Sequence, residues 1–238
     1  MTPPPAALIL AAGRGERMRP LTDHCPKPLL AVRGKPLIEW HLEALAAAGV
    51  RRVVINTAWL EAQFPAVLGD GSRWGLAIHY SHEGRDHGGA LETAGGIAKA
   101  LPHLVQPGRD SFWVVSGDVF LPGFPFSPAA ADRFTGGTAL AHLWLVANAP
   151  HHAQGDFGID RASGLATVEA PRLTWASVGL FRGAMFEGVA PDRPLKLRPL
   201  LDAALAAKRL SAERWDGLWI DVGTPERLAA AQCEETSR

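Results

Sequence analysis

The chain has 238 residues, of which 47% are hydrophobic, and its 24 basic and 24 acidic side chains give a formal net charge of zero. This length and composition suit one substantial α/β core, and the balanced charge provides no basic field for nucleic acid. Cys25 and Cys233 lie near opposite ends of the sequence, so neither a disulfide framework nor a zinc site is indicated. The apolar run near the N-terminus is too short for a membrane span, and we expect a cytoplasmic protein with no membrane partner.

The first predicted strand is the apolar run 7–12, which ends at a loop rich in glycine and basic residues. Gly13 and Gly15 permit sharp turns and bring backbone N–H groups close to an anion. The loop lacks the Gly-Lys-Ser/Thr ending of a Walker loop, and Met18 stands where a dinucleotide-binding loop needs a small residue. The cationic side chains of the loop are Arg14, Arg17, Arg19 and Lys27.

Prolines then exclude a long helix directly after the glycines. We therefore expect an extended loop that can wrap a triphosphate. These prolines are Pro20, Pro26 and Pro28.

Strands and helices are predicted to alternate over the next part of the chain. This order favours right-handed βαβ crossovers and a mainly parallel sheet covered by helices on both faces. Ligands of such sheets bind beyond the carboxyl ends of the strands, where Gly13 and Asp118 both fall. The expected helices are 36–48, 60–68 and 91–101, and the expected strands are 52–56, 76–80 and 112–116.

The sequence changes character at residue 123. Proline, glycine and alanine dominate residues 124–137, an apolar run follows over 138–146, and short segments with turn residues between them are typical of antiparallel strands. We interpret this part as a small β lobe on the same sheet. The short segments are 157–160, 165–169 and 175–181, followed by a helix near 197–208, a strand at 218–222 and a helix from Thr224.

Two aspartates at strand ends are candidate magnesium ligands. Asp118 follows the buried run FWVVSG, and Mg²⁺ typically takes one or two carboxylates in addition to substrate phosphates. Asp221 lies in the predicted strand 218–222, just before Thr224 and Pro225. The alternative for Asp118 is a turn or helix cap, and the alternative for Asp221 is a contribution to the N-cap of the following helix.

The string GxGxRMRPLTxxxPKPLL over residues 13–30 resembles the signature of the sugar-1-phosphate nucleotidyltransferases. The resemblance continues along the chain and implies an α/β fold, a single Rossmann-like domain over 1–238 with a mainly parallel mixed sheet and a small sugar-binding β lobe. Residues 1–122 would bind the nucleotide, and residues 123–238 would bind the sugar and close the domain.

The resemblance implies an enzyme that joins a nucleoside triphosphate to a sugar 1-phosphate and releases pyrophosphate. It favours UTP with N-acetylmuramate 1-phosphate, a reaction of peptidoglycan recycling, and GTP with mannose 1-phosphate is the alternative substrate pair. A non-catalytic regulator that binds nucleotide or sugar phosphate is the alternative of another class. No Asp-x-Asp motif occurs at 116–118, which argues against a glycosyltransferase. We expect a monomer or a small homo-oligomer.

The family's site residues carry over by position. Arg17 and Lys27 would be catalytic by holding the nucleotide phosphates, and Asp118 and Asp221 would share Mg²⁺. Nucleotide contacts are expected from Ala11, Ala12, Gly13, Gly15, Glu92, Thr93 and Gly95.

Sugar pockets combine carboxylates or amides with an aromatic face. Trp59 and Ser177 are further sugar candidates beside the main set. Many members of the family have a lysine where this chain has Ala170, and Arg182, Lys196 or Arg198 is a candidate replacement. The main set is Asn56, Asp156, Gly158, Glu169 and Trp175.

Overall fold

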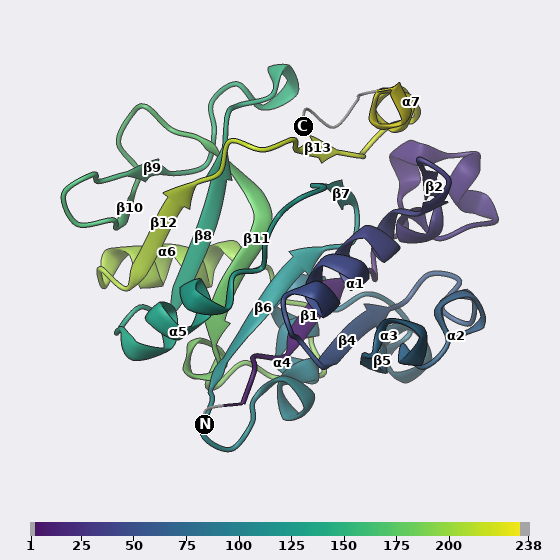
Figure 1. Ribbon diagram of the computed structural model, residues 1–238, viewed down its shortest axis with the longest axis horizontal. Coiled ribbons are helices and arrows are strands. Elements are labelled where there is room, and N and C mark those ends of the chain that lie inside the picture. The colour runs from purple at the N-terminus through teal and green to yellow at the C-terminus, as the bar shows by residue number, and fades with distance from the viewer. Residues whose placement is uncertain (1–2, 234–238) are drawn as a thin grey trace.

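A seven-stranded mixed sheet forms the centre of the computed structural model, which describes residues 3–233 (Figure 1). The strand order is β12-β8-β11-β6-β1-β4-β5, and only β11 runs antiparallel to its neighbours. Strands from 1–122 and from 123–238 therefore share one sheet. Their bounds are Ala7–Leu10 (β1), Arg52–Thr57 (β4), Ala77–His82 (β5), Ser111–Ser116 (β6), Ala141–Val146 (β8), Thr174–Arg182 (β11) and Leu210–Arg214 (β12).

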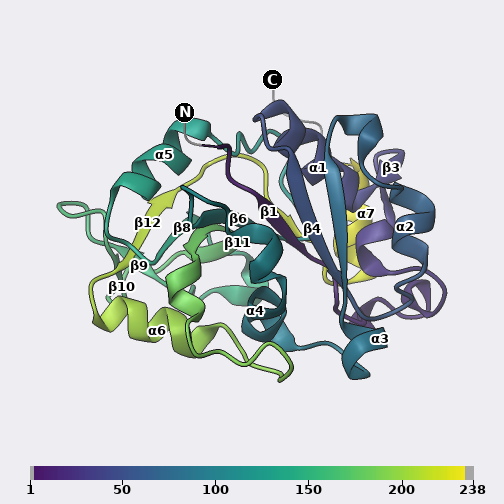
Figure 2. The ribbon, with the colours of Figure 1, turned by 90° about the horizontal axis from the view of Figure 1, so that it is seen from below.

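Helices cover both faces of this sheet (Figure 2). Helices α1 and α5 pack on one face, and α4 and α6 pack on the other, each over its own hydrophobic cluster. The helices are Leu37–Ala47 (α1), Gln63–Leu68 (α2), Glu83–His87 (α3), Glu92–Leu104 (α4), Pro128–Gly136 (α5), Arg198–Ala206 (α6) and Pro225–Cys233 (α7).

Short strand pairs lie outside the central sheet. Strands β2 (Ala31–Val32) and β3 (Lys35–Pro36) form one pair, β9 (Gly158–Ile159) and β10 (Ala166–Thr167) another, and β7 (Val119–Phe120) pairs with β13 (Ile220–Asp221). Helix α7 then returns to β2, since Gln232 Nε2 donates to the Ala31 carbonyl oxygen at 2.7 Å (Figure 1).

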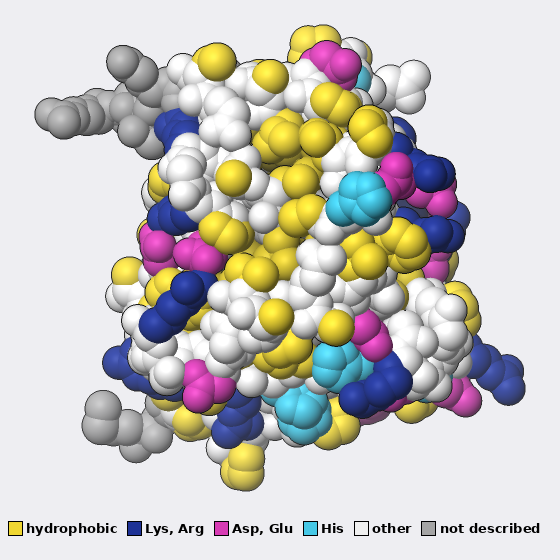
Figure 3. Space-filling model, turned by 90° about the vertical axis from the view of Figure 1, so that its right-hand side faces the viewer, with side chains coloured by type: hydrophobic (Ala, Val, Ile, Leu, Met, Phe, Trp, Pro, Cys, Tyr) yellow, Lys and Arg dark blue, Asp and Glu magenta, His cyan; other side chains and the backbone are white. Residues whose placement is uncertain are grey.

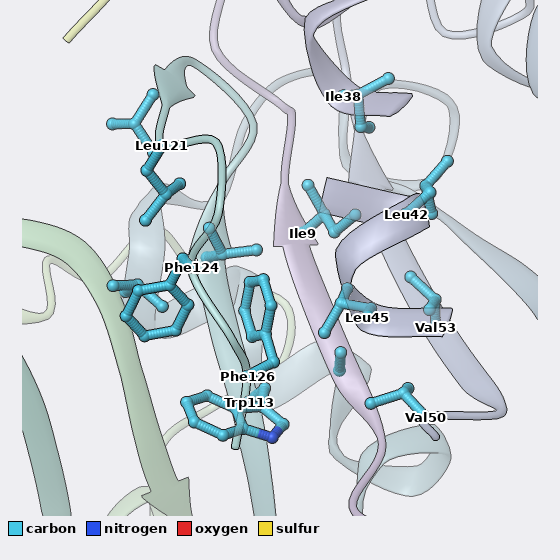
Figure 4. Packing of buried hydrophobic residues seen from close by; sticks show 14 of the residues in the cluster. Ile9, Ile38, Leu42, Leu45, Val50, Val53, Trp113, Leu121, Phe124 and Phe126 are labelled. Carbon is cyan, nitrogen blue, oxygen red and sulfur yellow. The ribbon is translucent and has the colours of Figure 1, made fainter. Parts of the chain in front are cut away.

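Strand β6 is buried on both faces. Trp113 and Val115 belong to the cluster under α1, whereas Phe112 and Val114 belong to the cluster under α4. Successive side chains of a strand point to opposite faces, which is why the four residues 112–115 between the terminal serines of β6 are all apolar. Figure 4 shows the α1 side of the core, where Ile38, Leu42, Leu45, Ile9 and Val53 gather beside Trp113, Phe124 and Phe126.

The predicted α/β class and mainly parallel mixed sheet are confirmed. Segment 175–181 is an antiparallel strand, as predicted, and its strand β11 lies inside the central sheet between β6 and β8. Segment 218–222 forms only the short strand β13, outside that sheet. The separate lobe is thus reduced to the β9–β10 pair.

The sequence patterns did not predict α5 and β12, nor the short elements β2, β3, α3 and β7. Helix α5 begins inside the segment rich in proline and alanine, where Ser127 caps it by accepting from Ala130 N, and Pro128 occupies its first turn. Strand β12 reads LSAER, and its polar residues are compatible with a strand because it lies at an edge of the sheet.

Figure 3 shows the side of the molecule that carries α2 and β2, where hydrophobic and polar side chains intermix and charged side chains lie mostly toward the margins. Within residues 3–233, no helix is both long enough and apolar enough to cross a bilayer.

A buried polar network holds the end of β1 against β4 and α4. Asn56 Oδ1 accepts from Ala11 N at 2.9 Å, and Asn56 Nδ2 donates to Glu83 Oε1 at 2.7 Å. Glu83 Oε2 accepts from Leu91 N at 2.7 Å. Burial raises the pKa of Glu83, while the bonds from Leu91 and Asn56 act in the opposite direction. This network fixes the backbone from which the glycine-rich loop departs.

Gly96 tests the tightness of this network. A Cβ on Gly96 would lie 2.6 Å from Glu83 Oε1 and 2.8 Å from Asn56 Nδ2, and neither atom can retreat without breaking a buried hydrogen bond. We expect Gly96→Ala to lower the free energy of unfolding by about 2 kcal/mol, because overpacking outweighs the better helix propensity of alanine. Urea denaturation measures this, with Gly89→Ala as the control since its Cβ would meet nothing within 4 Å. Equal stability of the two variants would contradict the prediction.

His41 predicts a dependence of stability on pH. This buried imidazole of α1 lies 2.9 Å from the Val119 carbonyl oxygen, to which Nε2–H donates, and burial lowers the pKa of His41 to about 4. In the unfolded chain this imidazole binds a proton near pH 6.5, whereas in the folded protein it stays neutral down to about pH 4. The free energy of unfolding therefore falls by about 3 kcal/mol as the pH drops from about 6.5 to 4.

The measurement is chemical denaturation across this pH range in the parent protein and in His41→Gln, which retains an N–H donor for Val119. We expect the variant to lose less stability on acidification than the parent. Parallel curves for the two proteins would show that His41 is not the group responsible.

Candidate active site

A cavity of about 540 Å³ lies at the carboxyl ends of β1 and β6. Apart from Gly95, every residue predicted to be catalytic or to bind the nucleotide lines it. Gly95 does not line the cavity and lies close to another backbone segment, because a Cβ there would lie 2.4 Å from the Arg193 carbonyl oxygen; its nucleotide contact stays a prediction. The predicted residues in the lining are Ala11, Ala12, Gly13, Gly15, Arg17, Lys27, Asn56, Glu92, Thr93 and Asp118.

The loop after β1 is folded into three short 3₁₀ turns, Glu16–Met18, Leu21–Asp23 and Lys27–Leu29, and is not extended as predicted. Prolines prevent a long helix but are compatible with single turns, which the sequence argument overlooked. Gly15 has φ 66°, and a Cβ there would lie 2.9 Å from Thr22 Cγ2. The Thr22 hydroxyl donates to the Gly15 carbonyl oxygen at 2.9 Å, so the turns brace one another.

Trp59 supports the same loop from β4's side. Its Nε1 donates to the Thr22 carbonyl oxygen at 2.8 Å, and the Arg14 guanidinium lies 4.4 Å from the centre of its ring. Trp59 was a sugar candidate in the sequence, and the structure gives its indole a contact to the phosphate loop.

An ion pair between Lys27 and Asp118 crosses the floor of the cavity. Lys27 Nζ lies 2.6 Å from Asp118 Oδ2, and the Ser116 hydroxyl donates to Asp118 Oδ1 at 2.6 Å. Burial acts to raise the pKa of Asp118, but the charge and hydrogen bond of Lys27 and the bond from Ser116 outweigh it and leave this pKa below its ordinary value. Asp118 is therefore ionised at neutral pH.

The backbone brings Asp221 beside Asp118. In the β13–β7 pair, Asp221 lies opposite Val119, and Val222 N donates to the Asp118 carbonyl oxygen at 3.0 Å. Arg227 Nη1 lies 2.7 Å from Asp221 Oδ2, so this carboxylate also has a cationic partner.

These two carboxylates fit magnesium. Residues 3–233 contain no cluster of three or more His, Cys, Asp or Glu side chains that would cage a metal. Mg²⁺ ordinarily uses one or two protein carboxylates and completes its shell with phosphate oxygens and water. Asp118 lines a cavity that contains a phosphate-type loop, and Asp221 does not line it but pairs with the backbone beside Asp118, so the two aspartates match that donor set.

Asp156, Gly158 and Glu169 lie in or next to the β9–β10 pair, Trp175 and Ser177 lie in β11, and none of the five lines the cavity. Asp156 Oδ2 accepts from Trp175 N at 2.8 Å, and a Cβ on Gly158 would lie 2.5 Å from the Glu169 carbonyl oxygen. Asn56 alone of the set lines the cavity, with Oδ1 and Nδ2 both engaged in the network described above. Their role in sugar binding stays a prediction.

Arg182 is excluded as the replacement for a lysine at position 170. It pairs with Asp110 at 2.9 Å and donates to the carbonyl oxygens of Phe134 and Thr135, at the opposite end of β6 from the cavity. Arg198 pairs with Asp202 on the surface of α6, and Lys196 is exposed.

Sequence reasoning missed Glu83 and Arg227. Glu83 follows a strand with no periodic signal, and only the fold shows that it lies under Asn56. Arg227 stands in the first turn of the helix that begins after Thr224, and this position offered a signal, because a long side chain there reaches back toward the preceding strand.

A family profile and several known proteins are similar to this chain over nearly its whole length. The nucleotidyl transferase family profile matches residues 6–238. The chain is 47% identical to N-acetylmuramate alpha-1-phosphate uridylyltransferase of Neisseria meningitidis serogroup B, covering 95% of this chain and 96% of that protein. It is 32% identical to the protein of the same name from Caulobacter vibrioides, covering 96% of both.

A solved structure shares the fold. It is a Bacillus anthracis protein assigned as a glucose-1-phosphate thymidylyltransferase, in complex with a sucrose, with a TM-score of 0.77 at 20% identity over 98% of this chain and 97% of that one. With the family profile spanning nearly the whole sequence and the cavity assembled from its signature residues, the chain belongs to the nucleotidyl transferase family.

Proposed function

We propose that this protein transfers a uridylyl group from UTP to N-acetylmuramate 1-phosphate, giving UDP-N-acetylmuramate and pyrophosphate. The names of two relatives that align over nearly the full chain support this substrate pair. The observation that carries the reaction type is the meeting of the Gly13–Gly15 loop, Lys27 and Asp118 in one cavity. We further propose a cytoplasmic role in the reuse of cell-wall sugars.

The chain's own residues supply alignment and charge stabilisation. A phosphate oxygen of the sugar 1-phosphate is already ionised at neutral pH, so attack on the α-phosphorus requires no protein base, and the leaving pyrophosphate departs from the opposite side. Loop N–H groups, Arg17 and Lys27 bind the phosphate oxygens on which negative charge accumulates. Glu92 and Thr93, at the start of α4, line the same cavity and are proposed to contact the base.

Asp118 and Asp221 would hold Mg²⁺, which when bound supplies positive charge to the phosphates and orients them. Asp118 is preset for this task because its lowered pKa keeps it ionised. In this proposal residues 1–122 bind the nucleotide, and residues 123–238, including the β9–β10 pair, bind the sugar.

The first test crosses each nucleoside triphosphate with N-acetylmuramate, N-acetylglucosamine, glucose and mannose 1-phosphates in the presence of Mg²⁺, with pyrophosphate release as the measurement. We expect turnover selective for UTP with N-acetylmuramate 1-phosphate. Turnover with GTP and mannose 1-phosphate would keep the mechanism and replace the substrates. Binding of nucleotide without turnover of any pair would favour a regulatory protein.

Asp118→Asn tests the carboxylate at the cavity floor. The amide retains the shape of the side chain but loses the charge that pairs with Lys27 and attracts Mg²⁺, so we expect turnover to fall by about 100-fold or more. Asp216→Asn is the control, since Asp216 pairs with Arg214 on the surface. A rate of Asp118→Asn close to that of the control would remove Asp118 from the mechanism.

A further inference from the structure

Arg227 joins three segments beside the cavity. Its Nη1 lies 2.7 Å from Asp221 Oδ2 of β13 and 2.6 Å from His151 Nε2, which accepts from it. His151 belongs to the short turn Pro150–His152, which precedes Asp156 and the β9–β10 pair. The side chain of Arg227 is 18% exposed, so it is largely enclosed by these contacts.

Part of this guanidinium is available for another partner. Among the hydrogen bonds of residues 3–233, the side chain of Arg227 uses only Nη1. Its Nη2 packs against Gly223, where a Cβ would lie 2.3 Å away, and Gly223 lines the cavity. Arginine presents its N–H groups as a planar fork that matches phosphate and carboxylate oxygens. Arg227 itself does not line the cavity, but unused donors of its fork lie next to Gly223, which does.

Each of the two candidate magnesium carboxylates has its own cationic partner. Lys27 neutralises Asp118, and Arg227 neutralises Asp221. A largely enclosed charge that loses its partner is costly unless another takes its place. If Asp221 binds a metal ion, Arg227 loses the carboxylate that balances its charge. Both substrates of the proposed reaction are anions and could take its place.

We propose that Arg227 is the residue that binds the anionic group of the sugar substrate, and that its ion pair with Asp221 holds it in place until that substrate arrives. This inference rests on the proposed function. The sugar, and not the nucleotide, is the partner because Lys27 and Arg17 lie with the glycine-rich loop, whereas Arg227 contacts the turn that leads to the β9–β10 pair. The anionic group is either the 1-phosphate or the carboxylate of an acidic sugar.

Steady-state kinetics of Arg227→Gln test the proposal, with Arg214→Gln as a matched control because Arg214 also pairs with an aspartate but on the surface. We expect the KM for the sugar 1-phosphate to rise by about 10- to 100-fold, as for loss of a charge-assisted hydrogen bond, with little change in the KM for UTP. Arg227→Lys keeps a charge for Asp221 but not the fork, and we expect an intermediate KM. It also provides the test if Arg227→Gln does not fold.

The source of the anion is resolved by comparing the binding affinities of N-acetylmuramate 1-phosphate and N-acetylglucosamine 1-phosphate, which lacks the carboxylate, so the second sugar need not be turned over. Equal losses for both sugars identify the phosphate, and a loss confined to the acidic sugar identifies the carboxylate. If the KM for UTP or the Mg²⁺ requirement rises as much as the KM for the sugar, Arg227 only positions Asp221 and the proposal is wrong.

Calorimetry separates this inference from the proposed function. Sugar 1-phosphate is titrated into protein that holds Mg²⁺ and a non-hydrolysable UTP analogue, so no turnover is needed. Weaker binding to Arg227→Gln than to Arg214→Gln supports the assignment even if the parent protein turns over a different sugar. Equal affinity of the two variants overturns it.

Discussion

The ion pair between Lys27 and Asp118 is the interaction on which the site depends. Lys27 is 8% exposed in its side chain, and an ammonium group so enclosed requires a partner. Asp118 provides it from the end of β6, so one contact fastens the glycine-rich loop to the centre of the sheet. The same contact lowers the pKa of Asp118 and keeps its carboxylate ionised. One ion pair therefore both anchors the loop and sets the charge of the site.

The hydrophobic clusters explain why polar groups meet at this edge. Strands β1 and β6 are buried on both faces by α1 and α4, which leaves their carboxyl ends as the place where the chain can turn and carry charge. Asn56 and Glu83 hold the start of the loop in place, because their buried hydrogen bonds link Ala11 to the start of α4. Packing thus positions the glycine-rich loop, and the ion pair with Asp118 orients the Lys27 side chain of that loop.

Local pattern was sufficient for the first half of the sheet and for the glycine-rich loop and Asp118, whereas the nucleotide contacts came from the family resemblance. The apolar run FWVVSGD indicates a buried strand that ends at Asp118, and the glycine-rich loop indicates an anion-binding turn. Asp118, Lys27 and Gly15 were predicted from these two segments. The second half was harder, because β12 is a polar edge strand and β11 joins the sheet only through partners distant in sequence. Arg227 and Glu83 were missed for a related reason, since their importance arises from neighbours that only folding brings together.

The position of β8 has a consequence for the growing chain. This strand pairs with β11 and β12, both of which follow it in the sequence. A nascent polypeptide that ends before Thr174 therefore carries the apolar strand β8 without either neighbour, although β1, β4, β5 and β6 are already complete. Sheet growth must proceed in two stages, and the interval between them is when an unpaired strand edge is exposed to other chains.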